Sequence, residues 1–267
     1  GGVTAALMAV AGVPVPAAFV LTGCEEDSPD NPSDPGTEND YFKLSDTKRV
    51  EMASSNLYWD GARFRFEPEA YSYPKAWDEA HVGHFYWSKN LAQSYAQSYD
   101  EYESARIGDL FCWDESLKSL RTVEGDTGWY VPSAQEWDYL ISHHAYLYCN
   151  LIKVAGDTVF GLMVLPYGTS QFLLQGSRVS PDRRTTYNMG MADFQSNLQH
   201  HAAFFPGAFH RDGSRIGLSR DGKYLTSTPF QSMPDAAECF NFYEYGITAW
   251  FGLGRGFGGS IRLVRNK

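Results

Sequence analysis

The sequence predicts an α+β domain made of short antiparallel strands, few helices and long loops. Three observations predict it: apolar residues alternate along residues 50–66, a capped helix follows Ser133, and glycine turns separate short strands from Lys223 onward. No segment of about 20–50 residues repeats, which argues against solenoids and propellers.

Composition narrows the class of partner. The chain has 267 residues, of which 43% are hydrophobic, enough for a packed core. Its net charge is −10, but seven acids and no base lie within residues 25–40. The rest of the chain is close to neutral and has no basic stripe that could neutralise phosphates. Nucleic acid is therefore not an expected partner.

The N-terminal residues 1–23 are apolar or small and end in Leu21-Thr22-Gly23-Cys24. This spelling resembles a bacterial lipobox. The resemblance implies that residues 1–23 are the remnant of a signal peptide and that Cys24 carries the lipid anchor. The alternative is a transmembrane helix followed by an ordinary cysteine, which the two prolines Pro14 and Pro16 disfavour.

For residues 24–40 the sequence predicts a lipidated cysteine followed by an acidic, disordered tether. The segment is rich in acids and prolines and has no apolar side chain after Cys24, so it cannot bury enough surface to offset its ordering entropy. Its start, "CEED", resembles the acidic export signal of outer-membrane lipoproteins in some Gram-negative gut anaerobes. We therefore expect a single domain, residues 41–267, displayed on the outer face of the outer membrane.

Within the domain, the first expected elements are two short antiparallel strands that end in Leu57 and begin at Phe64, with a turn at residues 59–61. Residues 76–113 are irregular, polar and aromatic, and we expect a long insertion there. Ser133 and Glu136 form the pattern of a capping box, so a helix is predicted to start at this point.

The central part of the sequence predicts a hairpin and a second helix. Residues 152–154 and the apolar run 159–165 flank a Gly156-Asp157 turn, which is typical of two antiparallel strands with a buried second strand. The stretch "MADFQSNLQHHAAFFPG", residues 191–207, predicts a short helix that runs into a strand at 203–205. Three or four more short strands are expected from Lys223 onward.

Four motifs then occur in the order of a known family. "VPSAQEWDYLI", "GLMVLPYG", "HAAFFPGAFHRDGSRIGLSRDGKYLTSTP" and "GGSIRLVR" resemble the helix and strands of C-type-lectin-like domains of the formylglycine-generating-enzyme subtype. The resemblance covers residues 42–265 and includes Fibrobacter-type paralogous domains and the variable proteins of diversity-generating retroelements. Leu225 departs from it, because the family usually has Trp there. The resemblance implies that the C-terminal strands pair with the N-terminal ones and that the loops between them form a ligand platform.

The predicted ligand surface lies in residues 228–257. Strand alternation would point Phe240 and Phe242 into the core and their neighbours outward. Five glycines between residues 252 and 259 favour an exposed loop over a buried strand. Aromatic rings and an arginine on such a loop have the composition of interface hot spots. The predicted ligand-binding residues are Phe230, Asp235, Cys239, Asn241, Tyr243, Tyr245, Trp250, Phe251, Leu253, Arg255 and Phe257.

The expected function is binding of a protein or glycan on another cell, a phage or a host, without catalysis. A sharper version is the variable protein of a diversity-generating retroelement. One alternative is an enzyme related to the formylglycine-generating enzyme, but that chemistry resembles copper-dependent thiol oxidation and needs two late cysteines, whereas only Cys239 lies in the C-terminal third. Another alternative is a subunit of fimbriae or a surface layer.

No cofactor and no metal ligand set is expected from the histidine spacing, although relatives in the family sometimes carry a structural Ca²⁺. Besides Cys24 there are three thiols, Cys112, Cys149 and Cys239, and the sequence leaves open whether Cys112 and Cys149 pair. Arg262 is expected to serve a structural hydrogen-bond network rather than the ligand.

Overall fold

The structure, a computed structural model, describes residues 40–267 except for 79, 86–122, 155, 213–214, 218–219, 231, 233–235, 245 and 255. The predictions for Cys24, the tether, Cys112 and most of the insertion therefore lie outside the described residues. Neither described helix, α3 (Ala134–His143) nor α4 (Met191–Gln199), is long and apolar enough to cross a bilayer.

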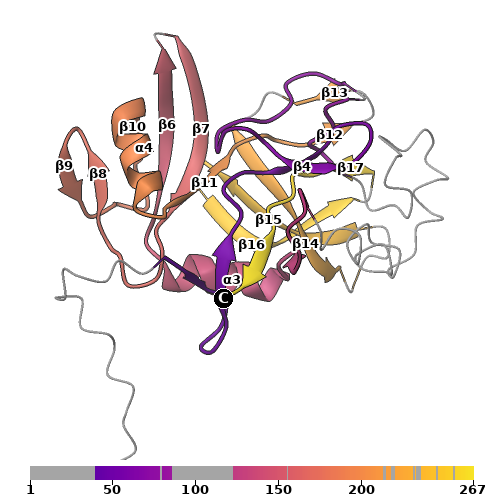
Figure 1. Cartoon of the computed structure of the whole chain (residues 1–267), viewed down its shortest axis with the longest axis horizontal. Helices are drawn as coiled ribbons and strands as arrows, with labels where there is room; N and C mark the ends of the chain where they lie inside the picture. Colours follow the sequence, from indigo (N-terminus) through magenta and orange to yellow (C-terminus); the bar gives the residue numbers. More distant parts are fainter. Residues whose placement is uncertain are drawn as a thin grey trace, which may run out of the picture. The chain divides into compact units, whose positions relative to one another are not determined.

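The architecture is mostly short antiparallel strands with these two helices, which is consistent with a small α+β or mostly-β fold (Figure 1). The described strands are β1 (Phe42–Lys43), β2 (Arg49–Met52), β3 (Leu57–Trp59), β4 (Phe64–Phe66), β5 (Trp129–Tyr130), β6 (Tyr146–Val154), β7 (Asp157–Val164), β8 (Phe172–Leu174), β9 (Ser177–Val179), β10 (Thr186–Gly190), β11 (Ala203–Pro206), β12 (Arg211–Asp212), β13 (Arg215–Ile216), β14 (Asp221–Pro229), β15 (Ala236–Tyr243), β16 (Gly246–Gly254), β17 (Phe257–Gly258) and β18 (Val264–Asn266).

The two ends of the domain meet in one sheet, with strand order β1-β2-β18-β5. Val264 on the last strand lies opposite Met52 on one side and Tyr130 on the other. The expected pairing of the C-terminal strand with an N-terminal one is thus confirmed. Arg262, just before this strand, is fully buried.

Helix α3 begins where its capping box predicts. The Ser133 hydroxyl accepts a hydrogen bond from the Glu136 N–H at 3.1 Å, and the Glu136 carboxylate accepts one from the Ser133 N–H at 2.9 Å. Such a cap stabilises a helix by about 1 kcal/mol. Trp137, Leu140 and Ile141 form the buried face of the helix.

The hairpin predicted near residue 156 is the pair β6–β7, the two long adjacent strands of Figure 1. It starts at Tyr146, earlier than the sequence indicated, and β10 and β11 complete a sheet of order β10-β6-β7-β11. From Val159 to Val164 every residue of β7 is buried, because both faces of this sheet are covered.

The prediction of a loop over residues 249–259 is wrong for residues 249–254 and 257–258, which are in strands. Residues 246–254 form the regular strand β16, which pairs with β15 in a sheet of order β14-β15-β16. Its glycines are accommodated because hydrogen bonds to β15 and the buried side chains of Ala249 and Leu253 hold the strand. Gly256 lies in a turn, and β17 after it pairs with β12.

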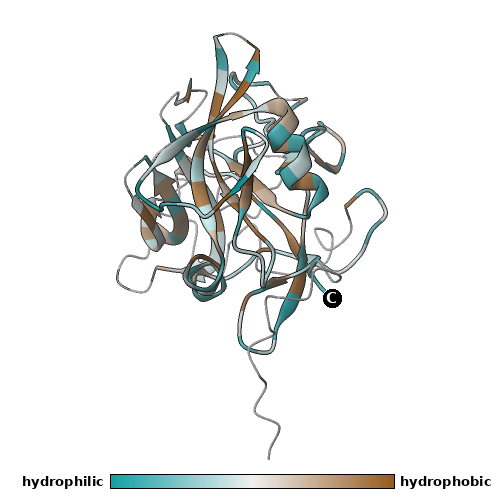
Figure 2. Ribbon diagram, turned by 90° about the vertical axis from the view of Figure 1, so that its left-hand side faces the viewer, coloured by the Kyte–Doolittle hydropathy of each residue, from teal (hydrophilic) through white to brown (hydrophobic). Residues whose placement is uncertain are grey.

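Two sheets separate three clusters of buried side chains. The middle cluster lies between the hairpin β6–β7 and the sheet β14-β15-β16 and contains Trp137, Phe160, Phe205, Phe240 and Phe242. A second cluster covers the opposite face of β15. A third covers the opposite face of β6–β7 together with α4. In Figure 2 hydrophobic residues follow the inner strands, while hydrophilic ones gather on outer turns.

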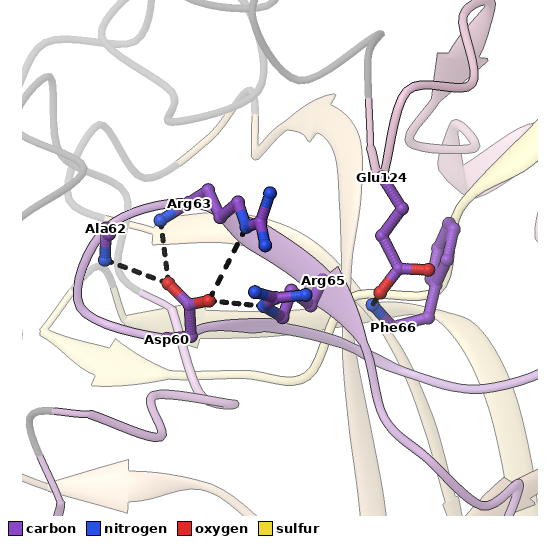
Figure 3. Close-up of polar contacts among 6 residues, drawn as sticks. All are labelled: Asp60, Ala62, Arg63, Arg65, Phe66 and Glu124. Atoms are coloured by element: carbon purple, nitrogen blue, oxygen red, sulfur yellow. Dashed lines mark hydrogen bonds and ion pairs between the residues drawn. The ribbon is translucent and has the colours of Figure 1, made fainter.

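The predicted pairing of Leu57 with a strand at Phe64 is confirmed as the hairpin β3–β4, whereas β2 is a separate strand. Asp60 organises its turn (Figure 3). The carboxylate accepts hydrogen bonds from the N–H groups of Ala62 (2.9 Å) and Arg63 (2.8 Å) and forms an ion pair with Arg65. The Arg65 hydrogen bond and these N–H donors lower the pKa of Asp60 to about 2. The other contact in the figure joins the Phe66 N–H to the Glu124 carboxylate.

Candidate functional site

The predicted ligand-binding residues gather on the sheet β14-β15-β16. Its register places three residues in each row across the strands: Asp221, Tyr243 and Gly246 form one row, and Lys223, Asn241 and Thr248 form the next. Because residues paired across strands share a face, both rows lie on the face opposite the middle cluster. We call this the outer face of the sheet.

A β-bulge in β16 shapes this face. Cys239 lies opposite Phe251 and Asn241 opposite Thr248, so two residues, Ala249 and Trp250, face the single residue Phe240. The Trp250 N–H donates to the Thr248 hydroxyl at 3.1 Å within the bulge. The extra residue shifts the alternation and brings Phe251 onto the outer face, while Ala249 is buried in the middle cluster.

Three large aromatic side chains are exposed here. Trp250 is 48% exposed, Tyr243 43% and Phe251 38%. Of the predicted residues, these three are confirmed as solvent-accessible. Phe240 and Phe242, predicted to face the core, are fully buried beneath them. The strands β15 and β16 therefore present these rings from a rigid base.

Three other predicted ligand residues are buried, and their assignment to the surface is wrong. Cys239 and Leu253 do lie on the outer face, but residues of β3, β4 and the chain end cover that part of it. Asn241 is buried by its contact with Lys223. Alternation along β15 gave the correct face for Cys239 and Asn241 but not their exposure.

The uncovered part of the outer face holds a cation that the sequence did not single out. The ammonium group of Lys223 is 3.2 Å from a carboxylate oxygen of Asp221 and 3.2 Å from the amide oxygen of Asn241. It also lies 5.3 Å from the centre of the exposed Phe251 ring and 4.9 Å from that of Phe209. Cation–π contacts of this kind hold the two rings and the charge in one arrangement.

Phe209 is held in an uncommon backbone conformation. Its φ is +52°, in the left-handed region that residues other than glycine seldom adopt. Its N–H donates to the Asp221 carbonyl at 2.6 Å, and its ring occupies the space above Gly217, where a Cβ would come within 1.7 Å of it. The tight fit fixes the ring beside Lys223.

The remaining predicted residues lie around this surface or outside the described part of the chain. Phe230 is half-buried, and its ring lies 3.1 Å from the position that a Cβ on Gly252 would take. Phe257 is half-buried against the second cluster and 5.1 Å from the His210 ring. Asp235, Tyr245 and Arg255 are outside the described residues, as is Cys24.

The thiols and histidines offer little reactive chemistry. Burial raises the pKa of the Cys239 thiol to about 12 and also raises that of Cys149, so both are protonated at neutral pH. His84 is buried, and burial lowers its pKa to about 4. Within the described ranges no three His, Cys, Asp or Glu side chains come together as a metal site.

Apart from the outer face of the sheet, a concave surface lies along the outer side of α3. This groove has a volume of about 600 Å³, and Lys48, Tyr130, Glu136 and Tyr139 are among its lining residues. Lys48 forms an ion pair with Glu136 and lies 4.4 Å from the Tyr130 ring, while the Tyr139 hydroxyl donates to Asp46. Its principal charged side chain is thus already engaged within the protein.

Comparison with models of known protein families, with curated proteins and with solved structures finds no match for this chain.

Proposed function

We propose that the chain is a ligand-binding module without catalytic activity, whose ligand sits on the surface formed by Tyr243, Trp250 and Phe251. The observation that carries the proposal is the gathering of these rings. In the described part of the chain five large hydrophobic side chains are exposed, and the three aromatic ones all lie on β15 and β16. Exposed Trp and Tyr side chains dominate the energetics of protein interfaces.

The side chains that pack beneath the rings hold them in place, as a binding site requires and a mobile apolar patch does not. Phe240 and Phe242 anchor β15 in the middle cluster, and Lys223 fixes Phe251 from the outer face. A surface held in its binding conformation loses less entropy when a ligand binds. This is the arrangement expected of a recognition site on a rigid scaffold.

The proposed ligand is a protein or glycan on another cell, a phage or a host. We also propose the C-type-lectin-like subtype of the fold and an anchor on Cys24 that displays the domain at the outer membrane. Two acyl chains would anchor the protein stably where one would not. Metabolic labelling with an alkyne fatty acid tests this anchor: the wild type should be labelled and Cys24→Ala should not.

The sharper proposal is a variable protein of a diversity-generating retroelement. It requires a near-copy of the DNA that encodes Thr226–Val264 beside the gene, differing mainly at adenines, and a gene for a reverse transcriptase. Sequencing of this locus tests the proposal. If neither element is present, the retroelement proposal fails while the binding module stands.

The binding site is tested by screening the purified chain against a glycan array and a random-peptide display library. We expect hits that are lost in the double variant Trp250→Ala/Phe251→Ala. The matched control is Ile152→Ala/Val154→Ala, which removes two exposed hydrophobic side chains from β6. Hits that survive the first variant, with its fold intact by circular dichroism, would place the ligand elsewhere.

A further inference from the structure

The strand β16 is the edge of its sheet. The strand order is β14-β15-β16, and β16 pairs only with β15 among the described residues. No backbone hydrogen bond from Gly246–Gly254 leads elsewhere in the described ranges. In the described part of the chain, one row of N–H and C=O groups on this strand thus has no backbone partner.

This edge has only one of the features that usually prevent pairing with another strand. Its nine residues, GITAWFGLG, include no proline and no charged side chain. Natural edge strands are commonly protected by lysine, proline or a bulge. Here only the bulge at Ala249–Trp250 is present, and it leaves a stretch on each side, residues 246–248 and 251–254, with an open edge.

Two polar side chains beside the exposed rings, Lys223 and Thr248, are already bonded. Lys223 is engaged by Asp221 and Asn241, and the Thr248 hydroxyl accepts the Trp250 N–H. A glycan would need free side-chain donors and acceptors next to the rings. The hydrogen-bonding capacity that remains along β16 belongs to its main chain, and its natural complement is another extended main chain.

The absence of charged side chains on β16 further restricts the kind of segment that could pair with it. A partner segment with a charged centre would lose hydration against β16 and find no counter-charge there. An uncharged segment loses little hydration free energy and gains contacts with Trp250 and Phe251.

We infer that the ligand is an extended polypeptide segment with an uncharged centre, which adds to β16 as a fourth strand of the sheet. This inference rests on the proposed function and names the class of its ligand. Main-chain hydrogen bonds give such a complex its affinity, and the rings select alternate side chains of the partner.

The test uses peptides selected from a random 12-residue display library on the full chain. Each residue of a selected peptide is replaced in turn by its N-methyl form, which removes one N–H and keeps the side chain. We expect losses of at least about tenfold at alternate positions, because successive N–H groups of a strand point to opposite sides. Amide hydrogen exchange should slow within Gly246–Gly254 when the peptide binds.

Three outcomes would overturn the inference. The first is an N-methyl scan without a period of two. The second is selective binding of array glycans, with no selected peptide, that is lost in Trp250→Ala/Phe251→Ala; the proposed function would then stand. The third is a homodimer in analytical ultracentrifugation whose β16 amides are protected without any peptide, because a second copy would then occupy the edge. If neither peptides nor glycans bind, the proposed function fails as well.

Discussion

The indole ring of Trp137 lies flat on the ring of Phe240, with ring centres 4.4 Å apart and planes only 1° from parallel. This contact joins the buried face of α3 to the central strand of the sheet that carries the exposed rings. Both side chains are almost completely buried. The geometry of the proposed binding surface thus depends on the packing directly beneath it.

Replacing Trp137 by Ala should lower the free energy of unfolding by about 4 kcal/mol, because it removes a large buried ring and leaves a cavity. Urea denaturation measures this loss. Tyr139→Ala, on the accessible side of the same helix, should cost less than about 1 kcal/mol. Similar losses in both variants would contradict the packing described here.

Arg262 should be essential for stability rather than for binding. Its guanidinium donates to the Asn56 amide oxygen (3.0 Å) and to the carbonyls of Ala53 (2.9 Å) and Phe204 (2.6 Å), and burial lowers its pKa to about 10. Arg262→Met would leave these three acceptors without their donor, at a cost of at least about 3 kcal/mol. A denaturation midpoint equal to that of the wild type would show that the network is dispensable.

Acid should destabilise the fold through His84. The Nε2–H of the buried neutral ring donates to the Ala208 carbonyl at 2.7 Å, and burial lowers the pKa to about 4. Since the unfolded chain binds a proton near pH 6.5 and the folded one near pH 4, stability falls as the pH drops through this range. The loss between pH 7 and pH 4.5 should be about 2 kcal/mol.

Denaturation of His84→Gln at both pH values isolates this effect. Glutamine keeps a donor for the Ala208 carbonyl but cannot be protonated, so the acid-dependent loss should shrink. Buried His144, whose pKa burial also lowers, should account for part of the remaining loss. An unchanged pH dependence in the variant would exclude His84 as the source.

Glu238 should have the opposite effect on the pH profile. Burial raises its pKa above the ordinary value, and its Oε2 is buried without a hydrogen-bond partner among the described residues. The folded state thus favours the protonated carboxyl, and stability is lost as the pH rises through 4.5 and then through the higher pKa of the folded state. Glu238→Gln should raise the melting temperature at pH 7 but not at pH 4. An equal shift at both pH values would indicate a cause other than ionisation.

Local patterns in the sequence were sufficient to predict the elements that depend on residues close together in the chain. The capping box of Ser133 and Glu136 gave the start of α3, and the apolar run 159–165 gave a strand buried on both faces. Residues 249–254 of β16 were predicted as a loop because their glycines suggest irregular backbone, whereas pairing with β15 determines their conformation. Such pairing is a tertiary effect that propensity does not contain.

Exposure on the candidate surface was harder to predict for a similar reason. Alternation placed Cys239 on the correct face, but the residues that bury it include Leu57 of β3 and Phe64 of β4, which lie far earlier in the chain. Lys223 was overlooked because a lone lysine between a turn and a strand usually points into solvent. Asp221, two residues earlier on the same strand, is the signal that could have identified it.

The most direct test of the proposed binding site is the dissociation constant of the best selected ligand for three chains, measured by isothermal titration calorimetry. The wild type and the control Ile152→Ala/Val154→Ala should bind equally well, while Trp250→Ala/Phe251→Ala should bind at least about 30-fold more weakly, because loss of a hot-spot ring typically costs 1–2 kcal/mol or more. Equal affinity in all three folded chains would contradict the assignment of the ligand to the exposed rings of β16.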